Sequence, residues 1–83
     1  ERTKIMSKNF CVRQIDAVAT GKQLQQLRKE NGLTIIQLLN LFGFYSPSRI
    51  MRWEKGIALP PVRCLSVLAS LYGVKIDDII VYI

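Results

Sequence analysis

Apolar residues recur every three or four positions in five short stretches of the chain, and a glycine follows each of the first four. These glycines are Gly32, Gly43, Gly56 and Gly73. Apolar residues at this spacing lie on one face of an α-helix, and glycine is the residue that most often follows a helix end. No stretch shows the sustained alternation that indicates a β-strand. The pattern therefore predicts an all-α fold of five short helices joined by tight turns.

Residues that favour helix starts place the first two helices. Thr20 precedes the first helix, which ends before Gly32 and turns Leu24 and Leu27 inward. The second helix runs from 34 to 42 and opens with Thr-Ile-Ile-Gln. This sequence fits a capping box, in which the side chains of Thr34 and Gln37 bond each other's backbone amides. Its inward positions are expected to be Ile35, Leu38, Leu39 and Phe42.

The remaining three helices have weaker but consistent start signals. Ser46 is a suitable N-cap and Pro47 a suitable first residue for a third helix over 47–55. A fourth helix begins near Pro60 and Pro61. A fifth spans about 76–81, with two aspartates in its first turn, where acidic side chains favour the helix dipole. The expected inward face of the fourth helix consists of Val62, Leu65, Leu68, Ala69 and Tyr72.

The two ends of the chain differ in character. Residues 1–14 are mixed and basic without a clear period, so we expect an N-terminal arm there, followed by one domain over 15–83. The arm is either a disordered tail or a segment that touches DNA phosphates or a partner subunit. At the other end the apolar residues exceed what one short helix can bury, which predicts a dimer surface formed by Ile79, Ile80, Val81 and Ile83.

Composition narrows the possible functions. The chain has 83 residues, of which 49% are hydrophobic, and a net charge of +6, which favours a polyanionic partner. It has no histidine, and Cys11 and Cys64 match no metal-ligand spacing. We therefore expect no metal, no cofactor, no small-molecule ligand and no enzymatic activity, and two independent thiols in a reducing cytoplasm. No apolar run is long enough to span a membrane.

The third helix carries the most informative chemistry. On a helix, Ile50, Trp53 and Glu54 fall on one side, whereas the opposite side gathers Ser48, Arg49, Arg52 and Lys55. A basic stripe alone is often an ordinary solvated face. Here a helix over 34–42 and a short turn precede it, which makes a helix-turn-helix. In this motif the second helix enters the major groove, where arginine can bond guanine O6 and N7 together.

Glu54 is unexpected beside such a basic face, because a carboxylate there would repel DNA phosphates. We predict that it points inward and pairs with Arg28, near the end of the first helix, so that the pair holds the third helix against the first. Breaking a partly buried pair of this kind costs about 3–5 kcal/mol. The alternative is a surface glutamate that contributes little.

Three segments together resemble the phage-repressor-like, or XRE-type, helix-turn-helix DNA-binding family. They are GKQLQQLRKENGLTIIQL, GFYSPSRIMRWEKGIALP and LSVLASLYGVKIDDII, and the similarity extends from about Thr20 to Ile80. The resemblance implies a five-helix DNA-binding domain of bacterial or phage origin. Such a domain usually acts as a homodimeric repressor on an inverted-repeat operator in double-stranded DNA.

The resemblance also assigns roles to individual residues. It places Ser48, Arg49 and Arg52 at base-reading positions with Met51 at their edge, and it matches Arg28 and Glu54 to the family's Arg–Glu pair. Ser46 and Lys55 fit phosphate-contact positions. Further candidates for phosphate contacts are Tyr45, Thr34, Gln37, Lys22 and Arg63.

The chain departs from the family pattern in the second helix and in the turn. Ile35 stands where the family often has a DNA-contacting glutamine, and the second helix is unusually apolar, with Ile36, Leu39 and Leu41. The turn GFYSPS is one residue longer than the commonest form. Larger core side chains would explain the apolar helix. Alternatively, it is a protein-binding surface, and the chain is a protein-interaction module with weak or no DNA binding.

Overall fold

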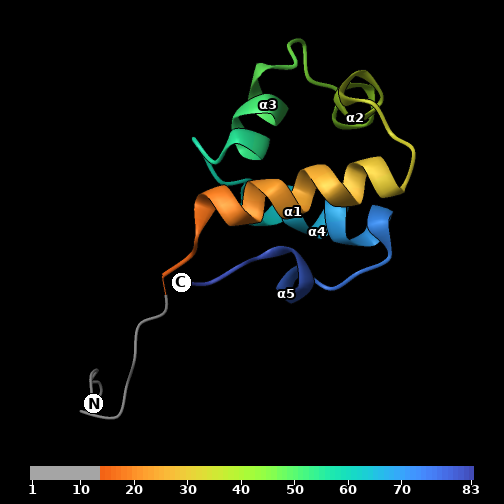
Figure 1. Cartoon of the computed structure of the whole chain (residues 1–83). Coiled ribbons are helices and arrows are strands. Elements are labelled where there is room, and N and C mark those ends of the chain that lie inside the picture. Colours follow the sequence, from red (N-terminus) through yellow and green to blue (C-terminus); the bar gives the residue numbers. More distant parts are fainter. Residues whose placement is uncertain (1–13) are drawn as a thin grey trace, which may run out of the picture.

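The computed structural model describes residues 14–83, and in this range it contains five α-helices and no regular strand. The helices are α1 (Ala17–Glu30), α2 (Ile35–Phe42), α3 (Ser48–Lys55), α4 (Val62–Tyr72) and α5 (Ile76–Ile79). The all-α, five-helix architecture is therefore confirmed. In Figure 1, α1 runs through the middle of the domain, with α2 and α3 on one side of it and α5 on the other. The expected N-terminal arm lies outside the described residues, apart from Gln14.

The start of α1 differs from the prediction. Its N-cap is Asp16, whose carboxylate accepts a hydrogen bond from the backbone N–H of Ala19 at 3.0 Å. Thr20, which was expected to precede the helix, lies inside it and is completely buried. Aspartate and threonine are both good N-caps. Here the Thr20 hydroxyl is buried where α1 packs, and it accepts a 2.9 Å hydrogen bond from the Val81 N–H instead.

The starts of α2 and α3 follow the sequence closely. The capping box is present, since the backbone N–H of Gln37 donates to the Thr34 hydroxyl at 3.1 Å and the backbone N–H of Thr34 donates to Gln37 Oε1 at 2.8 Å. α3 begins at Ser48, one residue later than predicted, although the backbone of Pro47 is already helical. The Ser46 hydroxyl accepts a 3.3 Å hydrogen bond from the Ser48 N–H.

α5 ends at Ile79, two residues earlier than expected, because the following residues pair with the segment before α1. The Asp16 N–H donates to the Val81 carbonyl at 2.7 Å, and the Ile83 N–H donates to the Gln14 carbonyl at 2.8 Å. An antiparallel bridge joins Ile15 and Tyr82 between these bonds. The end of α5 and the start of α1 are thereby held together.

The core forms where the helices converge. The inward positions predicted for α1 and α3 are buried, and those of α4 are too, except Val62, which is 74% exposed because it opens the helix. In α2, Leu38 is buried, while Ile35, Leu39 and Phe42 are partly buried against the core. The buried hydrophobic residues are Leu24, Leu27, Leu38, Ile50, Trp53, Cys64, Leu65, Leu68, Ala69, Tyr72 and Ile79.

Most of the apolar residues expected to form a C-terminal dimer surface are buried within the chain itself. Ile79 is fully buried, and Ile80 and Val81 are partly buried. Only Ile83 remains largely exposed, at 81%. The apolar C-terminal residues thus have a role within one chain, as a cover for α1 and α4.

A close approach between α1 and α3 fixes the position of α3. A Cβ atom on Gly21 would lie 2.5 Å from the carbonyl oxygen of Trp53 and 2.6 Å from that of Glu54. Only glycine allows the two backbones to come this near. Gly21 therefore lets α3 rest directly on α1, with its opposite face turned to the outside.

Candidate nucleic-acid interface

The predicted pair of Arg28 and Glu54 is confirmed, and it is bidentate. Arg28 Nε donates to Glu54 Oε2 at 2.7 Å, and Nη2 donates to Oε1 at 3.1 Å. The third nitrogen, Nη1, donates to the carbonyl of Leu33 at 2.9 Å, just before α2. Both side chains are largely buried, with exposed fractions of 10% and 7%. The Arg28 side chain of α1 thus bonds both to α3 and to the residue that leads into α2.

Charge and burial around this pair shift two pKa values. The hydrogen bond to Glu54 raises the pKa of Arg28, so the guanidinium stays charged in the folded chain. Burial raises the pKa of the Tyr72 hydroxyl to about 12, the negative charge of Glu54 adds to this shift, and Arg28 opposes it. The Tyr72 hydroxyl therefore stays neutral to a higher pH than an exposed tyrosine does.

With its inner face anchored, α3 presents its polar face outward. Ile50 and Trp53 are buried, whereas Ser48, Arg49, Arg52 and Lys55 are exposed, as the helical pattern predicts. Met51 is also exposed. Within residues 14–83, no carboxylate forms an ion pair with Arg49, Arg52 or Lys55. Their charges are consequently available to an anionic partner.

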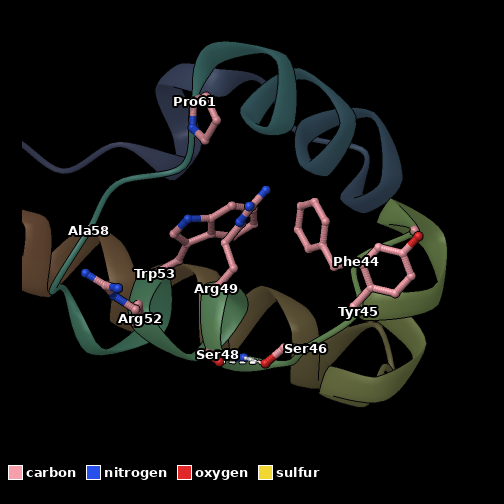
Figure 2. A pocket seen from close by; sticks show the side chains of 10 residues that line it. Phe44, Tyr45, Ser46, Ser48, Arg49, Arg52, Trp53, Ala58 and Pro61 are labelled. Atoms are coloured by element: carbon pink, nitrogen blue, oxygen red, sulfur yellow. Dashed lines mark hydrogen bonds between the residues drawn. The ribbon is translucent and has the colours of Figure 1, made fainter.

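An open groove of about 720 Å³ lies beside this face, between the α2–α3 turn and the residues that lead into α4. Figure 2 shows the Arg49 side chain pointing between Trp53 and Phe44, while Arg52 points away from the two rings. Pro61 borders the groove at its α4 end. The groove brings together five of the predicted site residues: Tyr45, Ser46, Ser48, Arg49 and Arg52.

Phe44 is the residue of this groove that the sequence did not reveal. Its ring lies 5.1 Å from the ring of Phe42, nearly parallel, and 6.0 Å from that of Trp53, nearly perpendicular. The guanidinium carbon of Arg49 lies 4.4 Å from the centre of the Phe44 ring. A turn has no hydrophobic period, and two aromatic residues, Phe44 and Tyr45, stand side by side in this one, so the sequence did not distinguish their roles.

The other predicted site residues lie outside the groove. Thr34 and Gln37 are exposed at the start of α2, where each bonds the other's backbone. Lys22 is exposed on α1, and Arg63 is exposed in the first turn of α4. In the groove itself, the Ser46 and Ser48 hydroxyls are 2.6 Å apart, and Tyr45 is fully exposed in the turn.

Core packing explains only part of the apolar character of α2. Ile35 and Leu39 pack against the core, as larger core side chains would. Ile36 and Leu41 do not, because they are 56% and 60% exposed. Core packing therefore accounts for the first two residues only.

In the described range no helix has both the length and the apolar character needed to cross a membrane. The same range contains no group of three or more side chains suited to hold a metal ion. The exposed polar face of α3 and its neighbouring groove form the candidate site.

Comparisons with known proteins agree with this architecture. A family model described as a helix-turn-helix domain matches residues 19–79. The structure of the S. venezulae BldD DNA-binding domain is similar, with a TM-score of 0.66 and 24% sequence identity over 78% of this chain and 96% of that one. A crystal structure of the DNA-binding domain of BldD gives a TM-score of 0.65 and 23% identity over 92% of this chain and 100% of that one. No curated protein matches the chain.

Proposed function

The chain belongs to the helix-turn-helix domain family, and we propose that it is a sequence-specific DNA-binding transcriptional regulator that reads the major groove with α3. The observation that carries the proposal is the outer face of α3. Four polar or basic side chains are exposed there, and within residues 14–83 none of them forms an ion pair. The inner face of the same helix is fixed by Gly21 and by the Arg28–Glu54 pair.

In this proposal the outer face of α3 contacts base edges. Arg49 and Arg52 donate to guanine O6 and N7, Ser48 bonds a base or a phosphate, and Met51 offers an apolar contact to a thymine methyl group at the edge. Phosphate contacts supply much of the affinity, which falls as the salt concentration rises. The proposed phosphate contacts are Ser46, Lys55, Tyr45, Thr34, Gln37, Lys22 and Arg63.

The proposed unit of binding is the domain over 15–83, acting in the cytoplasm as a homodimer on an inverted repeat. A dimer places two copies of α3 about one helical turn of DNA apart, so that its symmetry matches that of the operator. The proposed effect is repression, in which the bound dimer occludes a promoter. The two similar solved structures are described as DNA-binding domains, which supports the DNA partner but not the repressor role.

The test is a selection of bound duplexes from a random pool, followed by salt titration of the enriched sequence. We expect an inverted repeat whose affinity falls steeply with salt. Arg52→Ala should then lose about 1–3 kcal/mol of binding free energy and relax the preference at one base pair per half-site. A matched control is Lys29→Ala, which removes an exposed cation near the end of α1, outside the proposed interface. Absence of any enriched sequence would contradict the proposal.

A second candidate function rests on Ile36 and Leu41, which expose apolar side chains on α2. Exposed apolar patches often mark protein-binding surfaces. Under this alternative the chain is a protein-interaction module that binds a partner through α2. Weak DNA binding without sequence preference, together with loss of partner binding in Ile36→Gln, would favour it over the proposal above.

A further inference from the structure

We propose that Phe44 is a positioning residue for Arg49: its ring holds the guanidinium in place before DNA binds, and so sharpens the preference for the base pair that Arg49 contacts. The inference rests on the proposed function, in which Arg49 reads a base edge. It goes beyond that function because Phe44 itself contacts no DNA in this arrangement.

The first observation is that Phe44 is itself firmly held. Gly43 ends α2 in the left-handed conformation, with φ of +71°, and the Phe44 N–H then donates to the carbonyl of Leu39 at 3.1 Å. The Phe44 ring contacts two other rings, those of Phe42 and Trp53, which lie 5.8 Å apart and nearly perpendicular to each other. Since Trp53 is buried, this three-ring cluster attaches the turn to the core.

The second observation is the place of Arg49 on this cluster. Its guanidinium carbon lies 4.4 Å from the centre of the Phe44 ring, well within the distance at which cation–π attraction acts. No carboxylate within residues 14–83 pairs with Arg49. In the described part of the chain, the ring is therefore what restrains this exposed side chain.

The third step concerns the hydrogen-bond donors of Arg49. A cation–π contact is electrostatic and satisfies none of the five N–H donors of arginine, so they remain available to guanine O6 and N7. A side chain that is already held loses less conformational freedom on binding. Phe44 should therefore increase the affinity for the correct base more than the affinity for DNA in general.

Arg52 provides an internal comparison. It lies one turn further along α3 and also borders the groove, but Figure 2 shows it pointing away from the rings of Phe44 and Trp53. If Phe44 positions Arg49, the effect of a Phe44 substitution on DNA affinity should depend on whether Arg49 is present, and should not depend on Arg52. An effect on folding alone would weaken the contribution of both arginines equally.

The experiment is a double-mutant cycle on the enriched duplex from the selection, read by fluorescence anisotropy, with urea unfolding as a check on each variant. Phe44→Leu should weaken binding about two- to fivefold, which is the range expected for an exposed cation–π contact. The loss should disappear in an Arg49→Ala background and persist in an Arg52→Ala background. Phe44→Tyr keeps the ring and should bind normally. Phe42→Leu, which disturbs the same cluster without touching Arg49, should show no coupling to Arg49.

A readout on the free protein separates this inference from the proposed function. In the NMR spectrum, the Arg49 Nε–H signal should move when Phe44→Leu removes the ring, and should stay in place in Phe44→Tyr. An unmoved signal, or additive losses in the cycle, would overturn the positioning role while leaving DNA binding intact. A wild-type chain that enriches no duplex would overturn the proposed function and the specificity part of the inference with it.

Discussion

Replacement of Glu54 by alanine is the perturbation that most strongly tests how α3 is held. The substitution leaves the Arg28 guanidinium largely buried, with one remaining acceptor, the carbonyl of Leu33 at 2.9 Å. Removal of one partner from a buried pair costs about 3–5 kcal/mol, because the other charge stays uncompensated. The two hydrogen bonds that are lost, of 2.7 and 3.1 Å, agree with this range at about 1.5–3 kcal/mol for each charged bond.

Such a loss is large for a chain of this size. A domain of 83 residues typically unfolds with a free energy of about 5–10 kcal/mol, so Glu54→Ala should remove close to half of it. The melting temperature should fall by about 12 °C or more, since each 1 kcal/mol corresponds to about 4–8 °C in small domains. Urea unfolding followed by far-UV circular dichroism measures the free energy directly.

Two companion variants make this prediction specific. Glu30→Ala removes an exposed carboxylate that accepts a hydrogen bond from Gln26, and it should change the unfolding free energy by less than about 0.5 kcal/mol. Arg28→Met combined with Glu54→Leu removes both buried charges and should regain most of the loss. If Glu54→Ala lost less than about 1 kcal/mol, or if the double variant were no more stable than the single one, the buried pair would not be what holds α3 against α1.

Three further predictions concern other parts of the domain. Gly21→Ala should lower the free energy of unfolding by about 1–3 kcal/mol in urea, although alanine is the better helix former, because its Cβ would meet the backbone of α3. The control Ser66→Ala, on the exposed face of α4, should leave the free energy of unfolding unchanged. Equal stability of the two variants would contradict the close approach of α1 and α3. The Tyr72 pKa of about 12 lies above the value of about 10 in an unfolded chain, so the neutral hydroxyl contributes stability below pH 10 that is lost between pH 10 and 12. Tyr72→Phe should make unfolding free energy depend less on pH in that window, and parallel curves for the two proteins would be the contrary result. Ile36→Gln with Leu41→Gln should leave the affinity for the enriched duplex unchanged, and a clear loss in anisotropy titrations would place α2 in the DNA interface.

The sequence predicted those features that depend on local spacing. The capping box of Thr34 and Gln37 needs only four consecutive residues, and the helical periods of α1 and α4 mark their buried faces. The Arg28–Glu54 pair spans 26 positions, yet it was predictable because a carboxylate beside a basic face requires a cation elsewhere. The resemblance to a known motif supplied the same pairing.

The features that were missed depend on long-range contacts without a local signal. Gly21 lies inside a helix, where the sequence alone shows only a residue with a low helix propensity. Glycine is needed there because the backbone of α3 leaves no room for a Cβ atom. The pairing of residues 14–16 with 81–83 is too short to show alternation, so the fifth helix was predicted too long. Asp16 and Thr20 are both plausible N-caps, and only the packing of α1 decides between them. The contact of Phe44 with Arg49 depends on how one turn folds back on α3.

The most direct test of the central claim, that α3 reads base edges in the major groove, uses 7-deazaguanine in the enriched duplex. This base lacks the N7 acceptor but keeps normal pairing, so substitution at one guanine at a time removes a single major-groove contact. We predict that substitution at one or two guanines in each half-site weakens binding of the duplex by about 1–3 kcal/mol. At one of these guanines, the Arg52→Ala variant should bind the normal and the substituted duplex equally well. Equal affinity for every substituted duplex would contradict this claim, because Arg49 and Arg52 would then make no hydrogen bond to guanine N7.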